Sequence, residues 1–216
     1  VFGFLLTVFP RWLGGPPVTA RRYVILAVLL VTGMGLFYLG LFSARALAVI
    51  GVGMFAAGWT LAGATLIAIY RASKRKGAHE RALILAVAAG ALGLLAFAWA
   101  LATGNAQAHV IARALGLWLF LGATLFAVSH RMIPFFGQGA LQNYPVVSPA
   151  WSLPLAIACL AGHALLEIAA LPQWLFVCDL PLALVALQHS VHWNFRRSLT
   201  VRLLGMMFRF ADFRWV

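Results

Sequence analysis

Residues 23–42 read YVILAVLLVTGMGLFYLGLF, and this stretch decides the fold class because it is long and apolar enough to cross a lipid bilayer. A transmembrane helix needs about 20 such residues. The whole chain has the same character, since 64% of its residues are hydrophobic, 9% are charged and the mean hydropathy is +0.97. Soluble domains hold only about 45–50% apolar residues. We therefore predict an integral membrane protein.

Further stretches of the same kind predict an all-α fold, a polytopic transmembrane helix bundle with six full spans. The long unbroken apolar runs exclude a membrane β-barrel, whose strands alternate over about 10 residues. Residues 1–9, VFGFLLTVF, read as the second half of a partial first span. We therefore expect residues 1–216 to form a single transmembrane domain that is incomplete at both ends. The six full spans are expected near Tyr23–Phe42, Ala46–Tyr70, Ala82–Ala102, Ile111–Val128, Trp151–Leu171 and Trp174–Trp193.

The positive residues fall mainly on one side of the predicted spans, which sets the orientation in the membrane. Twelve Lys and Arg residues lie in alternate loops on that side, and only Arg45 and Arg113 lie on the other. Because cytoplasmic loops carry the excess of Lys and Arg, the chain is expected in the cytoplasm after the partial first span and after the last full one. The net charge of +12 is spread over short loops, which argues against nucleic-acid binding and for contact with anionic lipid. Residues 203–216, too short and too charged to span, are expected to lie along the interface or to begin a further span.

An ionisable pair, His130-Arg131, closes the apolar run of residues 111–128. Burying such a pair without partners in hydrocarbon would cost several kcal/mol, so it is expected at the membrane boundary or in an internal cavity. His189 and His192 lie near the same cytoplasmic end of the sixth full span and share one helix face. His130, His189 and His192 could converge there as ligands of copper or beside the edge of a haem. The alternative is that they cap helix ends and contact solvent.

Two other residues on this side have simpler expected roles. His79 falls in the basic loop and is expected to be solvated. Pro134, followed by Gly137 and Gly139, is expected to end the helix just after His130-Arg131, with a polar loop beyond it.

His163 lies at the opposite depth, within residues 159–167, CLAGHALLE. Its small Ala and Gly neighbours would leave room for a planar macrocycle, which makes His163 the best single haem-ligand candidate. The structural alternative is a hydrogen bond to a carboxylate such as Asp179, which the neighbouring helix brings to a similar depth. Glu167 lies one turn further along the same face. His109, at the outer start of the fourth full span, could bind a metal ion or be a solvated loop residue.

The remaining features predict packing rather than chemistry. The sequence has no glycine-rich phosphate loop, no HExxH helix and no Gly-x-Ser-x-Gly elbow. Cys159 and Cys178 lie inside predicted spans and are expected to be small packing residues without a disulfide. Glycines within the spans permit close approach of helices, the examples being Gly33, Gly35, Gly51, Gly53, Gly90 and Gly93.

Two ordered motifs carry a resemblance to a known family. Residues 2–17, FGFLLTVFPRWLGGPP, resemble the FGFLLTAVPNWTGxPP signature of the NnrS family, and residues 130–136, HRMIPFF, are similar to its RxIPFFT segment. The chain departs from the pattern at Arg11, where the family often has Asn, and at Gly137, where Thr is usual. The resemblance implies a multi-pass protein of the bacterial inner membrane that binds haem and copper. It also implies a role in nitric oxide metabolism and in protection from nitrosative stress.

On this resemblance we expect haem of the b type, held by His163 or by the set His130, His189 and His192. Copper is expected as a second metal, at the same set or at His109. Arg131 is expected to pair with a haem propionate through its guanidinium fork. The expected partners are the lipid bilayer, haem, nitric oxide and subunits of a membrane complex.

Two other classes of function stay open. A transporter or channel would need a continuous path of polar groups, for which Glu167, Asp179, His163 and the inner histidines are candidates. A non-catalytic subunit of a respiratory membrane complex would suit the few buried charges and the eight tryptophans near span ends.

Overall fold

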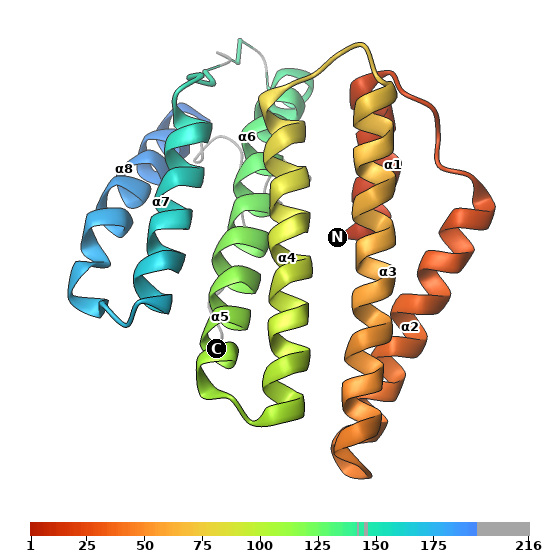
Figure 1. Cartoon of the computed structure of the whole chain (residues 1–216). Coiled ribbons are helices and arrows are strands. Elements are labelled where there is room, and N and C mark those ends of the chain that lie inside the picture. The colour runs from red at the N-terminus through yellow and green to blue at the C-terminus, as the bar shows by residue number, and fades with distance from the viewer. Residues whose placement is uncertain (142, 145–146, 194–216) are drawn as a thin grey trace.

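The structure is a computed structural model that describes residues 1–141, 143–144 and 147–193. Within these ranges every regular element is a helix, which confirms the all-α prediction. Long helices run up and down the molecule and are joined by short loops (Figure 1). In chain order they are α1 (Phe2–Leu13), α2 (Ala20–Phe42), α3 (Arg45–Ala72), α4 (Ala78–Thr103), α5 (Ala106–Ala114), η1 (Leu115–Gly122), α6 (Ala123–Ala140), α7 (Ser152–Ile168), η2 (Pro172–Trp174) and α8 (Phe176–His192).

The helices are those of a multi-pass membrane protein, although the predicted count of six full spans is not confirmed. In the described part of the chain, five segments are long and apolar enough to cross a membrane. Helices α1 and α7 are apolar but shorter, with 12 and 17 residues. The predicted tail of residues 203–216 lies outside the described residues. The five long segments are Ala20–Phe42, Arg45–Ala72, Ala78–Thr103, Ala106–Gly139 and Pro172–His192.

Basic residues gather at the end of the bundle that is uppermost in Figure 1, where α1 and α3 finish and α4 begins. Arg11 lies in the last turn of α1, and the basic stretch of residues 71–76 leads from α3 to α4. Arg45 begins α3 at the opposite end. The helix directions therefore gather these charges at one end of the bundle, as the alternate loops predicted. That this basic end faces the cytoplasm stays a prediction from the positive-inside rule.

Close packing joins α2 to α3 at several glycines, and Gly33 and Gly51 face each other there. A Cβ atom on Gly33 would lie 2.5 Å from the backbone nitrogen of Phe55, and one on Gly51 would lie 2.8 Å from the carbonyl oxygen of Gly33. Real Cβ atoms do not approach backbone so closely, so both positions require glycine. Gly35 and Gly53 instead face open space, and the prediction that they serve close packing was wrong.

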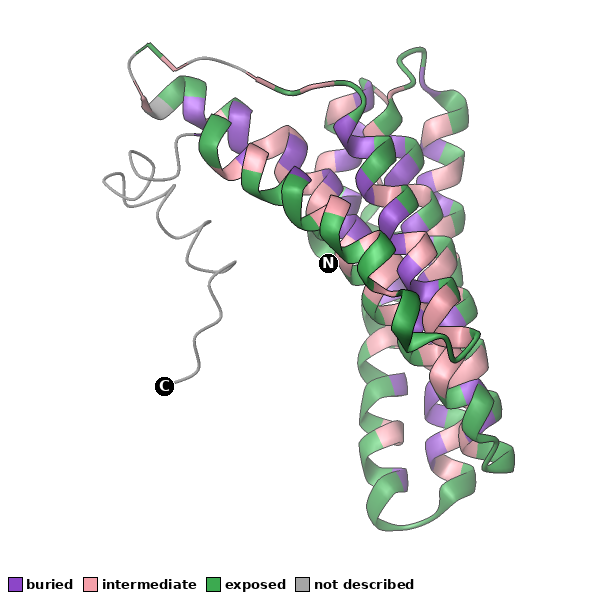
Figure 2. Ribbon diagram, turned by 90° about the vertical axis from the view of Figure 1, so that its left-hand side faces the viewer, coloured by how far each residue is buried: buried purple, intermediate pink, exposed green. Residues whose placement is uncertain are grey.

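The apolar core lies where α1, α3, α4 and α6 meet, around the fully buried side chains of Phe9, Leu66 and Leu83. The outer faces of the helices are largely exposed (Figure 2) and carry apolar residues such as Val31 and Leu187. An exposed surface so apolar suits hydrocarbon as its solvent rather than water. The bilayer is therefore the environment of these helices.

The fourth predicted span is longer and less regular than expected. Its middle, η1, is a π-helix, and α6 continues through Pro134 to Ala140. The prediction that Pro134 ends the helix was wrong. A proline removes only one backbone donor, and the hydrogen bonds of the flanking turns keep the helix continuous.

Beyond the helix the ring of Tyr144 covers Gly137, and burial raises the pKa of the Tyr144 hydroxyl above its ordinary value.

Candidate functional site

A chain of hydrogen bonds joins three histidines at the basic end of the bundle. Nε2 of His79, in the first turn of α4, lies 2.9 Å from Nδ1 of His130 on α6. Nε2 of His130 lies 2.9 Å from Oγ of Ser152, the first residue of α7. The same hydroxyl oxygen lies 3.1 Å from Nε2 of His189 on α8. Ser152 is thus the centre on which two imidazoles from different helices converge, and we call these four residues the inner network.

His130, Ser152 and His189 of the inner network are buried, His79 is half-buried, and the two buried rings are fully hydrogen-bonded. His130 and His189 are 4% and 2% exposed, and Ser152 is completely buried. Nδ1 of His189 donates to the carbonyl oxygen of Val185 at 2.9 Å, so both rings have both nitrogens engaged. Ring contacts with Phe126 on α6 shield them further. Buried polar groups need hydrogen-bond partners, and the nitrogens of His130 and His189 have them.

The sequence predicted two of the three histidines of the inner network. It also predicted His192, which lies outside the network, and it did not predict His79. His130 and His189 come together as predicted. His192 does not join them, since its side chain is exposed and its Nδ1 donates to the carbonyl oxygen of Gln188 at 2.7 Å. The prediction that His79 is a solvated loop residue was wrong, because α4 begins at Ala78 and its first turn directs the ring into the bundle. Gly77 before the helix and Glu80 in its first turn were the available signals.

Arg131, next to the inner network, is held by two partners. Its guanidinium forms an ion pair with Glu80 and lies 4.3 Å from the centre of the Trp12 ring. The Glu80 side chain is only 3% exposed, and in the described part of the chain its Oε2 has no hydrogen-bond partner. Sequence reasoning missed Glu80 because 51 residues separate it from Arg131. The pairing of Arg131 with a haem propionate stays a prediction.

A second cluster, the outer network, surrounds His163 on α7. Nδ1 of His163 lies 2.5 Å from a carboxylate oxygen of Asp179 on α8, which confirms the predicted structural contact. The Trp118 ring lies over the imidazole with ring centres 3.8 Å apart. Trp118 in turn donates from Nε1 to Glu167 at 2.8 Å, and Glu167 forms an ion pair with Arg113 at 2.6 Å.

Trp118 was not predicted as part of this cluster. It lies within the π-helix η1, whose wide turns have no clear local sequence signature. The two networks are separated along α6 and η1 by a stretch that is apolar apart from Thr124.

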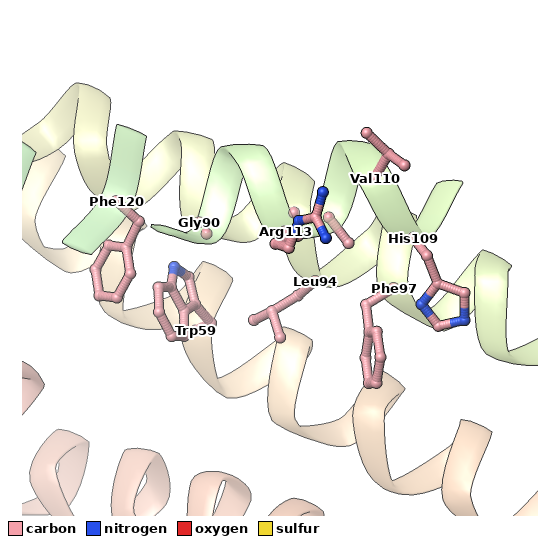
Figure 3. Close-up of a pocket in the computed structure, with 11 residues that line it drawn as sticks. Trp59, Gly90, Leu94, Phe97, His109, Val110, Arg113 and Phe120 are labelled. Atoms are coloured by element: carbon pink, nitrogen blue, oxygen red, sulfur yellow. The ribbon is translucent and has the colours of Figure 1, made fainter. Parts of the chain in front are cut away.

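A cavity of about 490 Å³ lies beside the outer network (Figure 3). Its wall is aromatic and aliphatic, with Trp59, Leu94 and Phe97 among the lining residues, and Arg113 and His109 are its basic ones. His109 is exposed but belongs to helix α5 rather than to a loop, and its ring meets Phe97 edge-on at 5.8 Å. Its role as a metal ligand stays a prediction.

The donor sets can be compared with the cofactors that the sequence suggested. Among the described residues, no group of three or more His, Cys, Asp and Glu side chains is arranged to hold a metal ion. His163 fits single ligation, because Asp179 engages Nδ1 while Nε2 has no hydrogen bond within the described part. A carboxylate behind a histidine is the common way in which proteins orient a metal-binding imidazole. The Nε2 atoms of His130 and His189 both lie within hydrogen-bond distance of Ser152 Oγ, and their role as metal ligands stays a prediction.

The fold and these networks define an all-helical, multi-pass membrane protein with paired ionisable groups buried among its helices. The chain belongs to the NnrS family, because the model of the family described as NnrS protein matches residues 1–211. The resemblance carried by residues 2–17 and 130–136 is therefore confirmed. Comparisons with curated proteins and with solved structures gave no match.

Proposed function

We propose that this protein is a haem-binding protein of the bacterial inner membrane that acts in nitric oxide metabolism or in protection from nitrosative stress. Membership of the NnrS family supports the link to nitric oxide. The single observation that carries the haem proposal is the His163–Asp179 pair, which leaves the Nε2 atom of a nearly buried imidazole without a hydrogen bond in the described structure.

In this proposal His163 would hold the haem, which is expected to be of the b type. Asp179 accepts the Nδ1 proton, fixes the tautomer and raises the basicity of Nε2. Trp118 lies on one face of the imidazole and restricts its rotation. Glu167 accepts a hydrogen bond from the Trp118 indole and so fixes the position of that ring. When bound, haem iron would supply a coordination position for nitric oxide.

Copper is the second cofactor of the proposal, at His130 and His189. Both Nε2 atoms lie within hydrogen-bond distance of the Ser152 hydroxyl, so His130 and His189 are the residues that would hold copper at this place. Imidazole suits copper as a ligand. His192 is not placed beside them by the described structure, so we do not include it in the copper set.

The haem proposal is tested by the absorption spectrum of the detergent-purified full-length protein, oxidised and dithionite-reduced, with iron and copper measured on the same sample. We expect a Soret band, reduced α and β bands and near-stoichiometric iron. His163→Ala should lower haem per protein strongly, Asp179→Asn partly, and His109→Ala not at all, since His109 is an exposed histidine on the same half of the molecule.

Two results would remove the proposal. Unchanged haem in His163→Ala would exclude His163 as the ligand. A colourless, metal-free protein, even with haem precursor added during expression, would favour the other classes: ion or solute flux in liposomes would indicate a transporter, and co-purification with a larger cytochrome assembly would indicate a subunit of a respiratory complex.

A further inference from the structure

The N-terminal motif of residues 2–17 has no part in either network, although its Trp12 contacts Arg131. It builds a cavity of its own. This cavity of about 500 Å³ lies where α1 ends and the chain turns towards α2. Gly14 ends α1 with a positive φ of 60°, and the amide of Gly15 donates to the Pro10 carbonyl at 2.9 Å. The turn thereby folds residues 14–18 back beside the last turns of α1.

The cavity combines hydroxyl groups, a cation and apolar walls. The hydroxyls of Thr7 on α1 and Tyr23 on α2 lie 3.3 Å apart within its lining. Arg11 lines the same cavity and is exposed. The side chains of Leu6 and Val18 supply apolar wall. A cavity lined by polar groups on one part and by apolar side chains on another suits an amphipathic ligand.

Arg11 has no negative partner in the described part of the chain. The three described carboxylates are already engaged, with Arg131, Arg113 and His163 respectively. The whole chain has four acidic residues against 16 Lys and Arg, so the charge of Arg11 faces an excess of its own sign. The complementary ligand is therefore an anion.

The position in the fold identifies the source of that anion. The cavity lies at the basic end of the bundle, the level at which lipid headgroups meet the helices. Arg21 and Arg22 follow in the first turn of α2, so the local field favours a negatively charged surface. A phosphate ester with an apolar tail fits the lining better than a free ion, because a free ion has no apolar part to contact the apolar walls.

We propose that this cavity binds the phosphate headgroup of an anionic phospholipid, with Arg11 as its cation and the Tyr23 hydroxyl as a hydrogen-bond donor. The Thr7 hydroxyl donates to the Gly3 carbonyl at 2.7 Å and lies beside the Tyr23 hydroxyl. The site is distinct from both networks.

The test uses the full-length protein in nanodiscs of mixed phosphatidylglycerol and phosphatidylcholine, with bound lipid measured by native mass spectrometry after release. Arg11→Asn should reduce retained phosphatidylglycerol about fivefold, the factor for one cation at an anionic surface. Tyr23→Phe should reduce it less. Arg22→Gln removes an equal charge at the same end but outside the cavity lining, so it should reduce retention clearly less than Arg11→Asn does.

Three results would overturn the proposal. Equal retention in Arg11→Asn and the wild type would exclude Arg11, and an equal loss in Arg22→Gln would reduce the effect to general surface charge. Displacement of the lipid by millimolar inorganic phosphate would assign the site to a free anion. Because Arg11 is exposed, the variant should fold, and helical circular dichroism checks this. Haem content should not change, which separates this test from that of the haem proposal.

Discussion

The ion pair between Arg131 and Glu80 allows the cost of breaking it to be worked out for each partner separately. The Glu80 side chain is 3% exposed and that of Arg131 is 32% exposed, so only Arg131 can turn to water when its partner is removed. Arg131→Met would leave a buried carboxylate unpaired, which typically costs about 3–5 kcal/mol. It would also remove the contact with Trp12, worth about 0.5–1 kcal/mol at a partly exposed site.

The opposite change should be much milder. Glu80→Gln keeps a hydrogen-bonding group beside Arg131 and leaves a guanidinium that reaches solvent, so we expect a loss of about 1 kcal/mol. The double variant should be more stable than Arg131→Met alone by about 2 kcal/mol, because no uncompensated charge stays buried.

These stabilities can be measured by unfolding in mixed micelles of dodecyl maltoside and increasing sodium dodecyl sulfate. The fluorescence of the eight tryptophans reports the transition. The reasoning would be refuted if Glu80→Gln cost as much as Arg131→Met, or if the double variant were no more stable than Arg131→Met.

Two further predictions use the same unfolding assay with matched controls. Gly51→Ala should cost about 1–3 kcal/mol by overpacking, because its new Cβ would press on the backbone of α2; Gly53→Ala, two residues away and facing open space, should cost nothing, and equal losses would contradict this account of α2–α3 packing. Ser152→Ala should cost about 1–3 kcal/mol because both Nε2 atoms of the inner network lose their partner. Ser190→Ala removes only a bond to a helical carbonyl, so a loss as large as that of Ser152→Ala would show that the inner network adds nothing.

The sequence predicted those parts of the structure that depend on residues close together along the chain. Unbroken apolar runs fixed the helices, and residue depth along a span was enough to place His163 beside Asp179 and to bring His130 towards His189. Depth could be counted from the span ends because an α-helix rises by a constant 1.5 Å per residue.

The parts that sequence did not predict depend on rotation about helix axes and on contacts between distant segments. His79 was misplaced because a shift of four residues in the start of α4 turned a loop residue into one that faces the bundle. Glu80 gave no sign of its pairing with Arg131, since no period links residues on helices α4 and α6. Trp118 reaches the outer network from a π-helix, which local residue preferences do not mark.

The π-helix η1 also determines how the two ends of the long segment Ala106–Gly139 are rotated relative to each other about the helix axis. Each α-helical residue turns the chain by about 100°, and each residue of the wider π-helix turns it by less, so a regular α-helix of the same length over Leu115–Gly122 would rotate everything after it relative to everything before it. Arg113 lies before the wide turns, and His130 and Arg131 lie after them. Regular α-helix in place of η1 would therefore turn His130 away from Ser152 and Arg131 away from Glu80, although every side chain of both networks would still be present.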